Sequence, residues 1–349
     1  MCGGALKEEL NEVDLLVRLN DYTNICALIA GLFAQNIKKV DYDNRIRLLT
    51  NANHYAYLKI SDGCNNCCSY CTIPRIRGRY KSVPIKDLVF EAKQLAKVGA
   101  KELILVAQDV TRYGEDLYGE NRLIDLLKEL EKIKDFLFIR LHYLYPEKLD
   151  TNLINYINTS KVVCNYFDIP LQHSSNKILK LMNRRSDESM HEQIIASIRS
   201  ICSSSTIRST FIVGYPGETR KDFLHLCNFL KKHQLDNVGF FSYSKEENTP
   251  AFYQKNHVAN WIKNRRLKTV QKLQRKIADS RCKQRVGQTT RAIVDYFDEK
   301  TGMVYCRDEF NSPDIDYVIV AKSSKLMPGS VATIKITGYN NCVFEGEIL

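Results

Sequence analysis

Short β-rich runs alternate with amphipathic helical stretches over residues 56–244. Apolar positions that recur every second residue predict strands, and a period near 3.6 predicts helices that bury one face. The expected strands are 56–61, 102–107, 137–143, 166–171, 207–213 and 238–243, and the clearest helices are 85–98, 122–133, 189–201 and 220–233. Six repeated βα units predict an α/β fold, a partial (β/α)6 barrel over residues 51–256, rather than the complete barrel of eight units.

The pattern changes after residue 256. Residues 257–285 place leucines and valines at helical spacing among ten Lys and Arg residues, which predicts a basic linker helix. Two interpretations of its positive charge remain open: the helix binds phosphates, or it is a solvent-exposed helix that only links two domains. Residues 286–349 contain five short β-type runs, at 290–295, 303–306, 317–321, 331–337 and 342–348. These runs predict a small all-β, OB-like barrel.

Residues 1–50 are interpreted as the remnant of an N-terminal α/β domain. We expect a short helix over 6–12, a strand over 13–17 and a helix through 25–29 that begins after the polar run 21–24. A piece of this size is too small to bury a core of its own.

The stretch directly after the first predicted strand carries three closely spaced cysteines. Cys64, Cys68 and Cys71 form a CxxxCxxC pattern, and three thiolates from a short loop suit an iron–sulfur cube with one iron left open. The alternatives are that the three cysteines bind zinc or simply pack, but structural zinc sites pair two CxxC knuckles and no second knuckle follows. Cys67 adjoins Cys68 and points away from it in an extended loop, so we interpret it as a bystander.

Polar residues also follow the other predicted strands. Gln108, His142, Gln172, His173 and Gly214 stand at successive strand ends. Because reactive groups gather at the carboxyl ends of parallel strands, these positions outline a pocket together with the cysteines. Two interpretations of His142 and His173 remain open: acid–base groups, or hydrogen-bonded histidines at the edge of the pocket.

Composition narrows the class of protein. The chain has 349 residues, 44% hydrophobic and 26% charged, and no apolar run long enough to span a membrane. Twelve cysteines without a secretory signal predict reduced thiols and a cytoplasmic protein. The net charge of +11 favours an anionic partner such as RNA or a ribonucleoprotein.

Segment 64–80, with Tyr70 directly before Cys71, the run 214–219 and the C-terminal barrel together resemble the radical S-adenosylmethionine (SAM) methylthiotransferases. The C-terminal barrel of that family is a TRAM domain. The runs 107–114, 139–146 and 312–316 resemble its RimO branch, which modifies an aspartate on a small-subunit ribosomal protein. The tRNA-modifying, MiaB-like branch and a non-catalytic ribosome- or RNA-binding protein with a structural cluster remain as alternatives.

The resemblance implies cofactors, site residues and partners. Cys64, Cys68 and Cys71 would hold a 4Fe–4S cluster whose open iron binds the amino and carboxylate groups of SAM. SAM cleavage would yield a deoxyadenosyl radical, a second SAM would supply the methyl group, and a second 4Fe–4S cluster would route the sulfur. The residues expected to contact SAM are Tyr70, Gln108, Gln172, Arg208 and Gly214; no side chain beyond the cluster ligands is assigned to catalysis. The partners implied are the ribosomal protein, on the ribosome, and a reducing electron-transfer protein.

The N-terminus departs from the family pattern. The second cluster of the family uses three cysteines, of which Cys2 matches the last, while the segment with the other two has no counterpart and Cys26 does not fall at a ligand position. We therefore expect a truncated gene product or a misplaced start codon, with an incomplete second cluster. Eight irons per chain would contradict this expectation.

Overall fold

Six parallel strands follow one another through the computed structural model, which describes residues 12–17, 21, 24–33, 46, 47, 49, 53–323 and 325–349. They pair in chain order within two three-stranded sheets, β1 (Tyr55–Lys59), β4 (Glu102–Val106) and β5 (Phe138–Leu141), then β6 (Tyr166–Gln172), β7 (Thr206–Val213) and β8 (Asn237–Ser242). The two sheets meet where Ile139 bridges Val163 and where the Leu144 N–H donates to the Asp168 carbonyl at 2.8 Å. The predicted partial barrel of six βα units is therefore confirmed.

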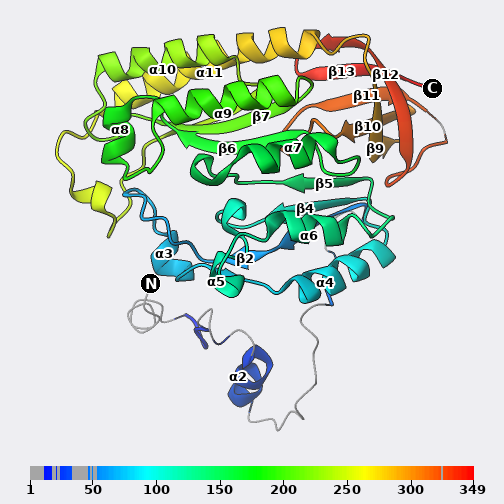
Figure 1. Cartoon of the computed structure of the whole chain (residues 1–349), viewed down its shortest axis with the longest axis horizontal. Coiled ribbons are helices and arrows are strands. Elements are labelled where there is room, and N and C mark those ends of the chain that lie inside the picture. The colour runs from blue at the N-terminus through cyan, green and yellow to red at the C-terminus, as the bar shows by residue number, and fades with distance from the viewer. Residues whose placement is uncertain are drawn as a thin grey trace.

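Helices cover the outer face of these strands, as Figure 1 shows for α6, α7 and α9. The main ones are α4 (Ile85–Lys97), α6 (Leu123–Leu130), α7 (Thr151–Thr159), α9 (Glu188–Ile201) and α10 (Arg220–His233). The chief apolar core lies between helices and strands and includes Leu58, Leu88, Leu105 and Phe211. Full burial of each such side chain contributes about 1.5–3 kcal/mol, which holds the layers together.

α10 shows how the local sequence sets a helix boundary. Thr219 accepts the N–H of Asp222, and the Asp222 side chain accepts the N–H of Thr219, so the two form a capping box. Its predicted bounds agree with the structure, and α7 lies between β5 and β6, where the repeated βα pattern predicts a helix without giving its bounds.

The basic segment forms one helix, α11 (Asn260–Lys283), as predicted. It packs along β8 and α10, and Val270 and Ile277 are buried on its inner face. Gln274 lies between them and donates to the Leu235 carbonyl at 2.8 Å, which anchors the middle of the helix.

The C-terminal segment forms a closed barrel in the order β10-β11-β13-β12-β9. Its strands are β9 (Thr289–Asp298), β10 (Met303–Asp308), β11 (Val318–Lys322), β12 (Val331–Asn340) and β13 (Val343–Ile348). All five predicted β-type runs are confirmed as strands. Closure leaves no unpaired edge and encloses a separate apolar core that includes Val294, Ile319 and Phe344.

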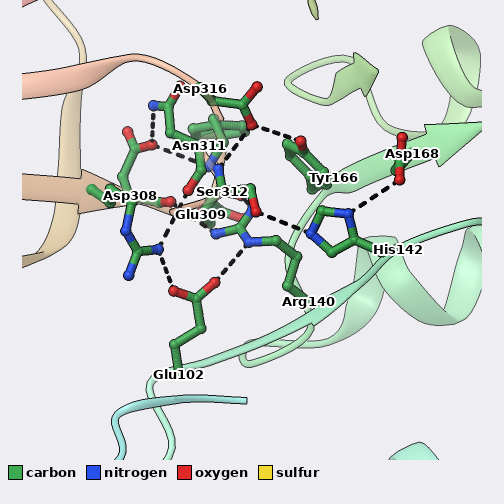
Figure 2. Close-up of polar contacts among 12 residues, drawn as sticks. Glu102, Arg140, His142, Tyr166, Asp168, Asp308, Glu309, Asn311, Ser312 and Asp316 are labelled. Atoms are coloured by element: carbon green, nitrogen blue, oxygen red, sulfur yellow. Dashed lines mark hydrogen bonds and ion pairs between the residues drawn. The ribbon is translucent and has the colours of Figure 1, made fainter. Parts of the chain in front are cut away.

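This barrel lies at the amino ends of the parallel strands, opposite α3 (Ile73–Arg77) and α8 (Asn176–Leu181) in Figure 1. Three buried side chains join the two domains. Glu102, the first residue of β4, accepts Arg140 Nε at 2.7 Å and also pairs with Arg307 of β10. Figure 2 shows further contacts that hold the segment 308–316 against the parallel strands, among them the one between Ser312 and His142.

Of the elements expected within residues 1–50, one agrees with the structure and one does not. The helix expected through 25–29 is present as α2 (Ile25–Leu32). The strand expected over 13–17 is wrong, because these residues have no partner strand among the described residues, and a lone strand is not stable. Of the helix expected over 6–12, residues 6–11 lie outside the described residues, and residue 12 is in a turn. None of the helices that the structure describes is both long and apolar enough to traverse a bilayer.

Candidate active site at the cysteine loop

The three cysteines lie on one loop, defined here as the cysteine loop, residues 63–80. It is bracketed by two short antiparallel strands, β2 (Ser61–Asp62) and β3 (Lys81–Ser82), and contains the short helix α3 (Ile73–Arg77). Since β2 follows β1 almost directly, the loop emerges at the carboxyl ends of the parallel strands, as the sequence predicts.

Gly63 allows the loop to close at its base. Its φ is +75°, and a Cβ atom at this position would lie 2.2 Å from the Arg79 carbonyl oxygen. The next residue, Cys64, donates its N–H to the Gly78 carbonyl at 3.1 Å. Only glycine tolerates this conformation and this approach, so the position of Cys64 depends on it.

The three cysteines are largely shielded from solvent. Cys64 and Cys68 are 7% and 8% exposed, and Cys71 is half-buried. Burial raises the pKa of the Cys64 and Cys71 thiols, and negative charge on Cys68 raises both further. Three thiolates in this setting would need a positive centre among them, which the irons of a cluster would supply.

Within the described part of the chain, no group of three His, Cys, Asp or Glu side chains lies around one metal position. Cys67 is exposed, and its thiol faces the Asn65 carbonyl at 3.9 Å, outside the buried group.

Asp109 holds the part of the cysteine loop around Cys64 in place. Asn66 Nδ2 donates to its carboxylate at 3.0 Å, and the Tyr80 hydroxyl donates to its carbonyl at 2.9 Å. The Asn66 N–H points at Cys64 Sγ, 3.4 Å away. Burial raises the pKa of Asp109 even though Thr111 and Asn66 donate to it. Asp109 thus connects the end of β4 to the backbone around the first cysteine.

Tyr215 holds the part of the cysteine loop around Ser69 and Tyr70 in place. Its hydroxyl lies 2.7 Å from Ser69 Oγ and donates to the Leu181 carbonyl at 3.1 Å, while the Ser69 N–H donates to the Met182 carbonyl. The half-buried Tyr70 ring stands edge-on to Tyr215, with centroids 6.4 Å apart. The structure therefore brings the 214–219 run and the cysteine loop into direct contact.

Arg184 was not predicted and is the one cation buried against the cysteines among the described residues. Its Nη1 lies 3.8 Å from Cys68 Sγ, its Nη2 donates to the Pro170 carbonyl at 3.0 Å, and its guanidinium lies over the Tyr145 ring. Burial alone would lower the pKa of Arg184, but the charges of Tyr70 and Cys68 raise it. Its Nε is buried without a hydrogen-bond partner in the part of the chain that the structure describes, beside a pocket of about 300 Å³. No periodicity or motif within the sequence marks this residue.

Two of the predicted SAM contacts carry features of a ligand site. Gln108 Oε1 is buried without a hydrogen-bond partner among the described residues. Gln172 ends β6 with φ +68°, and Tyr143, beyond the neighbouring β5, has φ +59°. Unpartnered buried oxygens and left-handed non-glycine residues cost free energy and concentrate where a ligand binds.

Gly214 has a packing role that its motif did not reveal. Its φ is +74°, and a Cβ atom would lie 2.3 Å from Lys263 Cγ of α11. Its N–H donates to Glu218 Oε2 at 2.7 Å, and Glu218 also accepts Arg266 Nη1 at 2.7 Å. The Gly214 N–H is therefore already used within the protein.

His142 and His173 both make hydrogen bonds within the protein. His142 lies between Asp168, 3.1 Å from Nδ1, and Ser312, 3.0 Å from Nε2, as Figure 2 shows. His173 accepts the Ser175 N–H at 2.9 Å and is fully buried. The hydrogen-bonded interpretation fits His142, which belongs to the contact with the C-terminal barrel. His173 Nε2 has no hydrogen-bond partner among the described residues and lies 3.6 Å from Glu218 Oε2.

Arg208 is not brought to the cysteine loop, which corrects its expected place in the pocket. It lies near the amino end of β7, about 20 Å of extended strand from Gly214. Its Nη1 donates to Asp168 at 2.9 Å, and its Nε lies 3.9 Å from Asp316. Burial alone would lower the pKa of Arg208, but these carboxylates raise it, so the guanidinium is already paired.

Cys2, the candidate ligand of a second cluster, lies outside the described residues. Cys26 is exposed on α2.

Comparison with known proteins decides the family. Residues 58–230 match the radical SAM superfamily and residues 286–349 match the TRAM domain. The chain is 41% identical to ribosomal protein uS12 methylthiotransferase RimO of Trichlorobacter lovleyi, over 99% of this chain and 79% of that protein. It is 42% identical to RimO of Alkaliphilus oremlandii, over 90% of this chain and 72% of that protein. The chain belongs to the RimO family of radical SAM methylthiotransferases.

The predicted family, fold class and enzyme class are thereby confirmed. Membership of the radical SAM superfamily also implies a 4Fe–4S cluster and SAM as cofactors. Among solved structures, coproporphyrinogen III oxidase (HemN) from Escherichia coli, a radical SAM enzyme, aligns with a TM-score of 0.49 at 14% identity, over 72% of this chain and 61% of that one.

Proposed function

We propose that this chain adds a methylthio group to the β carbon of an aspartate in ribosomal protein uS12, replacing one hydrogen of that carbon. The observation that carries the proposal is the group of Cys64 and Cys68, both buried, and half-buried Cys71 at the carboxyl ends of the parallel strands. The substrate is taken from relatives named for uS12 that are 41% and 42% identical to the chain. A low-potential electron-transfer protein would reduce the cluster.

In this proposal the three cysteines hold the 4Fe–4S cluster, one iron of which stays free for SAM. When bound, the cluster and SAM supply a radical that takes hydrogen from an unactivated carbon, which no side-chain base can do. Tyr70, Gln108 and Gln172 would line the SAM pocket; the unpartnered Gln108 Oε1 supports its part in this set. Gly214 would shape the pocket through its backbone turn.

The substrate is tested by anaerobic incubation of the reconstituted chain with SAM, sulfide and a reductant, and with either small ribosomal subunits or tRNA. We expect 5′-deoxyadenosine release that depends on the small subunit, and a mass gain of one methylthio group on a uS12 peptide. A gain on tRNA instead would favour the MiaB-like alternative. Absence of 5′-deoxyadenosine with every substrate would favour the non-catalytic alternative. The iron content of the same preparation separates four irons from eight and so tests the second cluster.

Replacement of Arg184 by glutamine is expected to weaken iron binding about 10- to 100-fold, the usual effect of losing an outer-sphere partner of a metal ligand. The reason is that Arg184 is the buried cation beside Cys68, so its loss leaves the cluster charge uncompensated. Iron release to a chelator under anaerobic conditions measures the effect.

Arg220→Gln is the matched control, because it removes the same charge from an exposed position of α10 that does not line the pocket beside Cys68. It should retain iron as the unchanged chain does. Equal iron release from both variants would contradict the assigned role of Arg184.

A further inference from the structure

α11 buries one face and exposes the other along its whole length. Val270, Gln274, Ile277, Ala278 and Cys282 are buried against the rest of the protein. Trp261, Arg265, Lys268, Lys272, Arg275 and Lys276 are all exposed and lie on the opposite side at helical spacing. We call these six residues the α11 stripe. The stripe has no part in the cysteine site.

The cations of the stripe lack the partners that the inner cations of the helix have. Arg266 pairs with Glu218 and Arg281 pairs with Asp236, each at 2.7 Å. No described carboxylate lies within ion-pair distance of the five stripe cations, and the one acid of the helix, Asp279, accepts the Tyr339 hydroxyl at 2.9 Å. Like charges four residues apart, as in Lys268 and Lys272, destabilise a helix. The stripe is therefore arranged for an anion that is not part of this chain.

An exposed tryptophan stands at the start of the same stripe. Trp261 is 67% exposed and, with Arg265, Lys268 and Lys272, lines a shallow depression of about 600 Å³. An indole next to a row of cations is the combination that binds single-stranded nucleic acid, where cations contact phosphates and aromatic rings stack on bases. An acidic protein surface would explain the cations but gives no reason for the indole.

We propose that the α11 stripe is an RNA-binding surface, with the cations on successive phosphates and Trp261 stacked on an unpaired base. A helix of 24 residues is about 36 Å long, enough to follow several phosphates. That the RNA is ribosomal RNA beside the substrate protein rests on the proposed function; binding to RNA does not. The stripe would hold the enzyme on the ribosome independently of the cluster.

The chain offers a direct probe, because Trp261 is its only tryptophan. Titration of the full chain with poly(U), without SAM or ribosomes, should quench tryptophan fluorescence. The logarithm of the affinity should fall with the logarithm of salt concentration with a slope of about −2 to −3.5, as for three to five phosphates on a single strand. Because the readout needs neither SAM nor uS12, its failure leaves the methylthiotransferase assignment standing, and the reverse also holds.

Charge reversal tests the stripe itself. Lys268→Glu/Lys272→Glu should weaken binding of labelled poly(U) on the order of tenfold or more, and make the salt slope shallower by about 1.4, since each single-strand phosphate contact contributes about 0.7. Trp261→Ala should weaken it about 5- to 100-fold, the range for one lost base stack. Lys93→Glu/Lys97→Glu is the control, because it makes the same change at the same spacing on exposed positions of α4, on the far side of the molecule from α11 in Figure 1.

The control variant should bind as tightly as the unchanged chain, and circular dichroism should show all variants folded. Unchanged fluorescence of Trp261 on addition of poly(U) would overturn the proposal. So would an equal loss of affinity in the α4 variant. Competition by polyglutamate as strong as that by RNA would also overturn it and would indicate an acidic protein partner instead.

Discussion

Replacement of any one of Cys64, Cys68 or Cys71 by alanine is expected to remove the four-iron centre and reduce SAM cleavage to background. Each thiolate of a cluster binds its own iron, so two remaining ligands leave a second iron without protein support. Iron content, visible absorbance and 5′-deoxyadenosine release after anaerobic reconstitution measure the loss.

Cys67→Ala is the matched control within the same loop. Its thiol is exposed and faces the Asn65 carbonyl, away from the other three, so iron content and SAM cleavage should not change. Loss of the cluster in this variant, or its retention in Cys68→Ala, would show that the ligands are wrongly assigned. Zinc in place of iron in the unchanged chain would do the same.

The parts of the site that could be predicted from the sequence are those with a local signal. The spacing of Cys64, Cys68 and Cys71 and the strand before them place three thiolates at the carboxyl end of the sheet, and that placement is present. The six strands were recognisable because each buries a periodic set of apolar side chains. Strand ends were predicted less well. Arg208 and Gly214 were both assigned to one pocket, although they stand at opposite ends of β7.

The parts that could not be predicted depend on contacts between distant segments. Arg184 reaches Cys68 across 116 positions of the sequence, and His142 meets Ser312 across 170. A single arginine or histidine carries no periodic signal, so only the fold reveals its partner. His142 therefore left two interpretations open in the sequence, while its contacts with Asp168 and Ser312 assign it to the domain contact.

The contact between the parallel-strand domain and the C-terminal barrel depends on a balance of buried charges around Glu102. Glu102 accepts Arg140 Nε at 2.7 Å and pairs with Arg307, and Asp295 accepts Arg307 Nε at 2.6 Å. Arg140 also donates to the carbonyl of Glu309 at 2.7 Å, on the segment 308–316. Two carboxylates thus match two guanidiniums, and all but Asp295 are almost completely buried.

Glu102→Gln is expected to destabilise this contact by about 3–5 kcal/mol, since it leaves two buried guanidiniums with one carboxylate. Opening should then expose the segment 308–316, whose Ser312 N–H is bonded to Asp316 at 2.9 Å. Hydrogen exchange of the peptide 308–316 should accelerate at least about 100-fold, since each 1.4 kcal/mol is a factor of ten. Glu129→Gln, which breaks the exposed pair with Lys132, is the control and should cost less than about 1 kcal/mol.

The same balance predicts how the contact responds to acid. Burial alone would raise the pKa of Glu102, but Arg140 and Arg307 outweigh it and lower the pKa below its ordinary value. A carboxylate with a lowered pKa stabilises the folded state at neutral pH, and that contribution is lost as the pH falls below about 4 toward the folded-state pKa. Exchange of peptide 308–316 in the unchanged chain, corrected for the intrinsic rate, should therefore rise in this acid range, whereas Glu102→Gln should lack that step. An identical acid profile in both proteins would place the acid-sensitive group elsewhere and remove Glu102 from the account of how the two domains are held together.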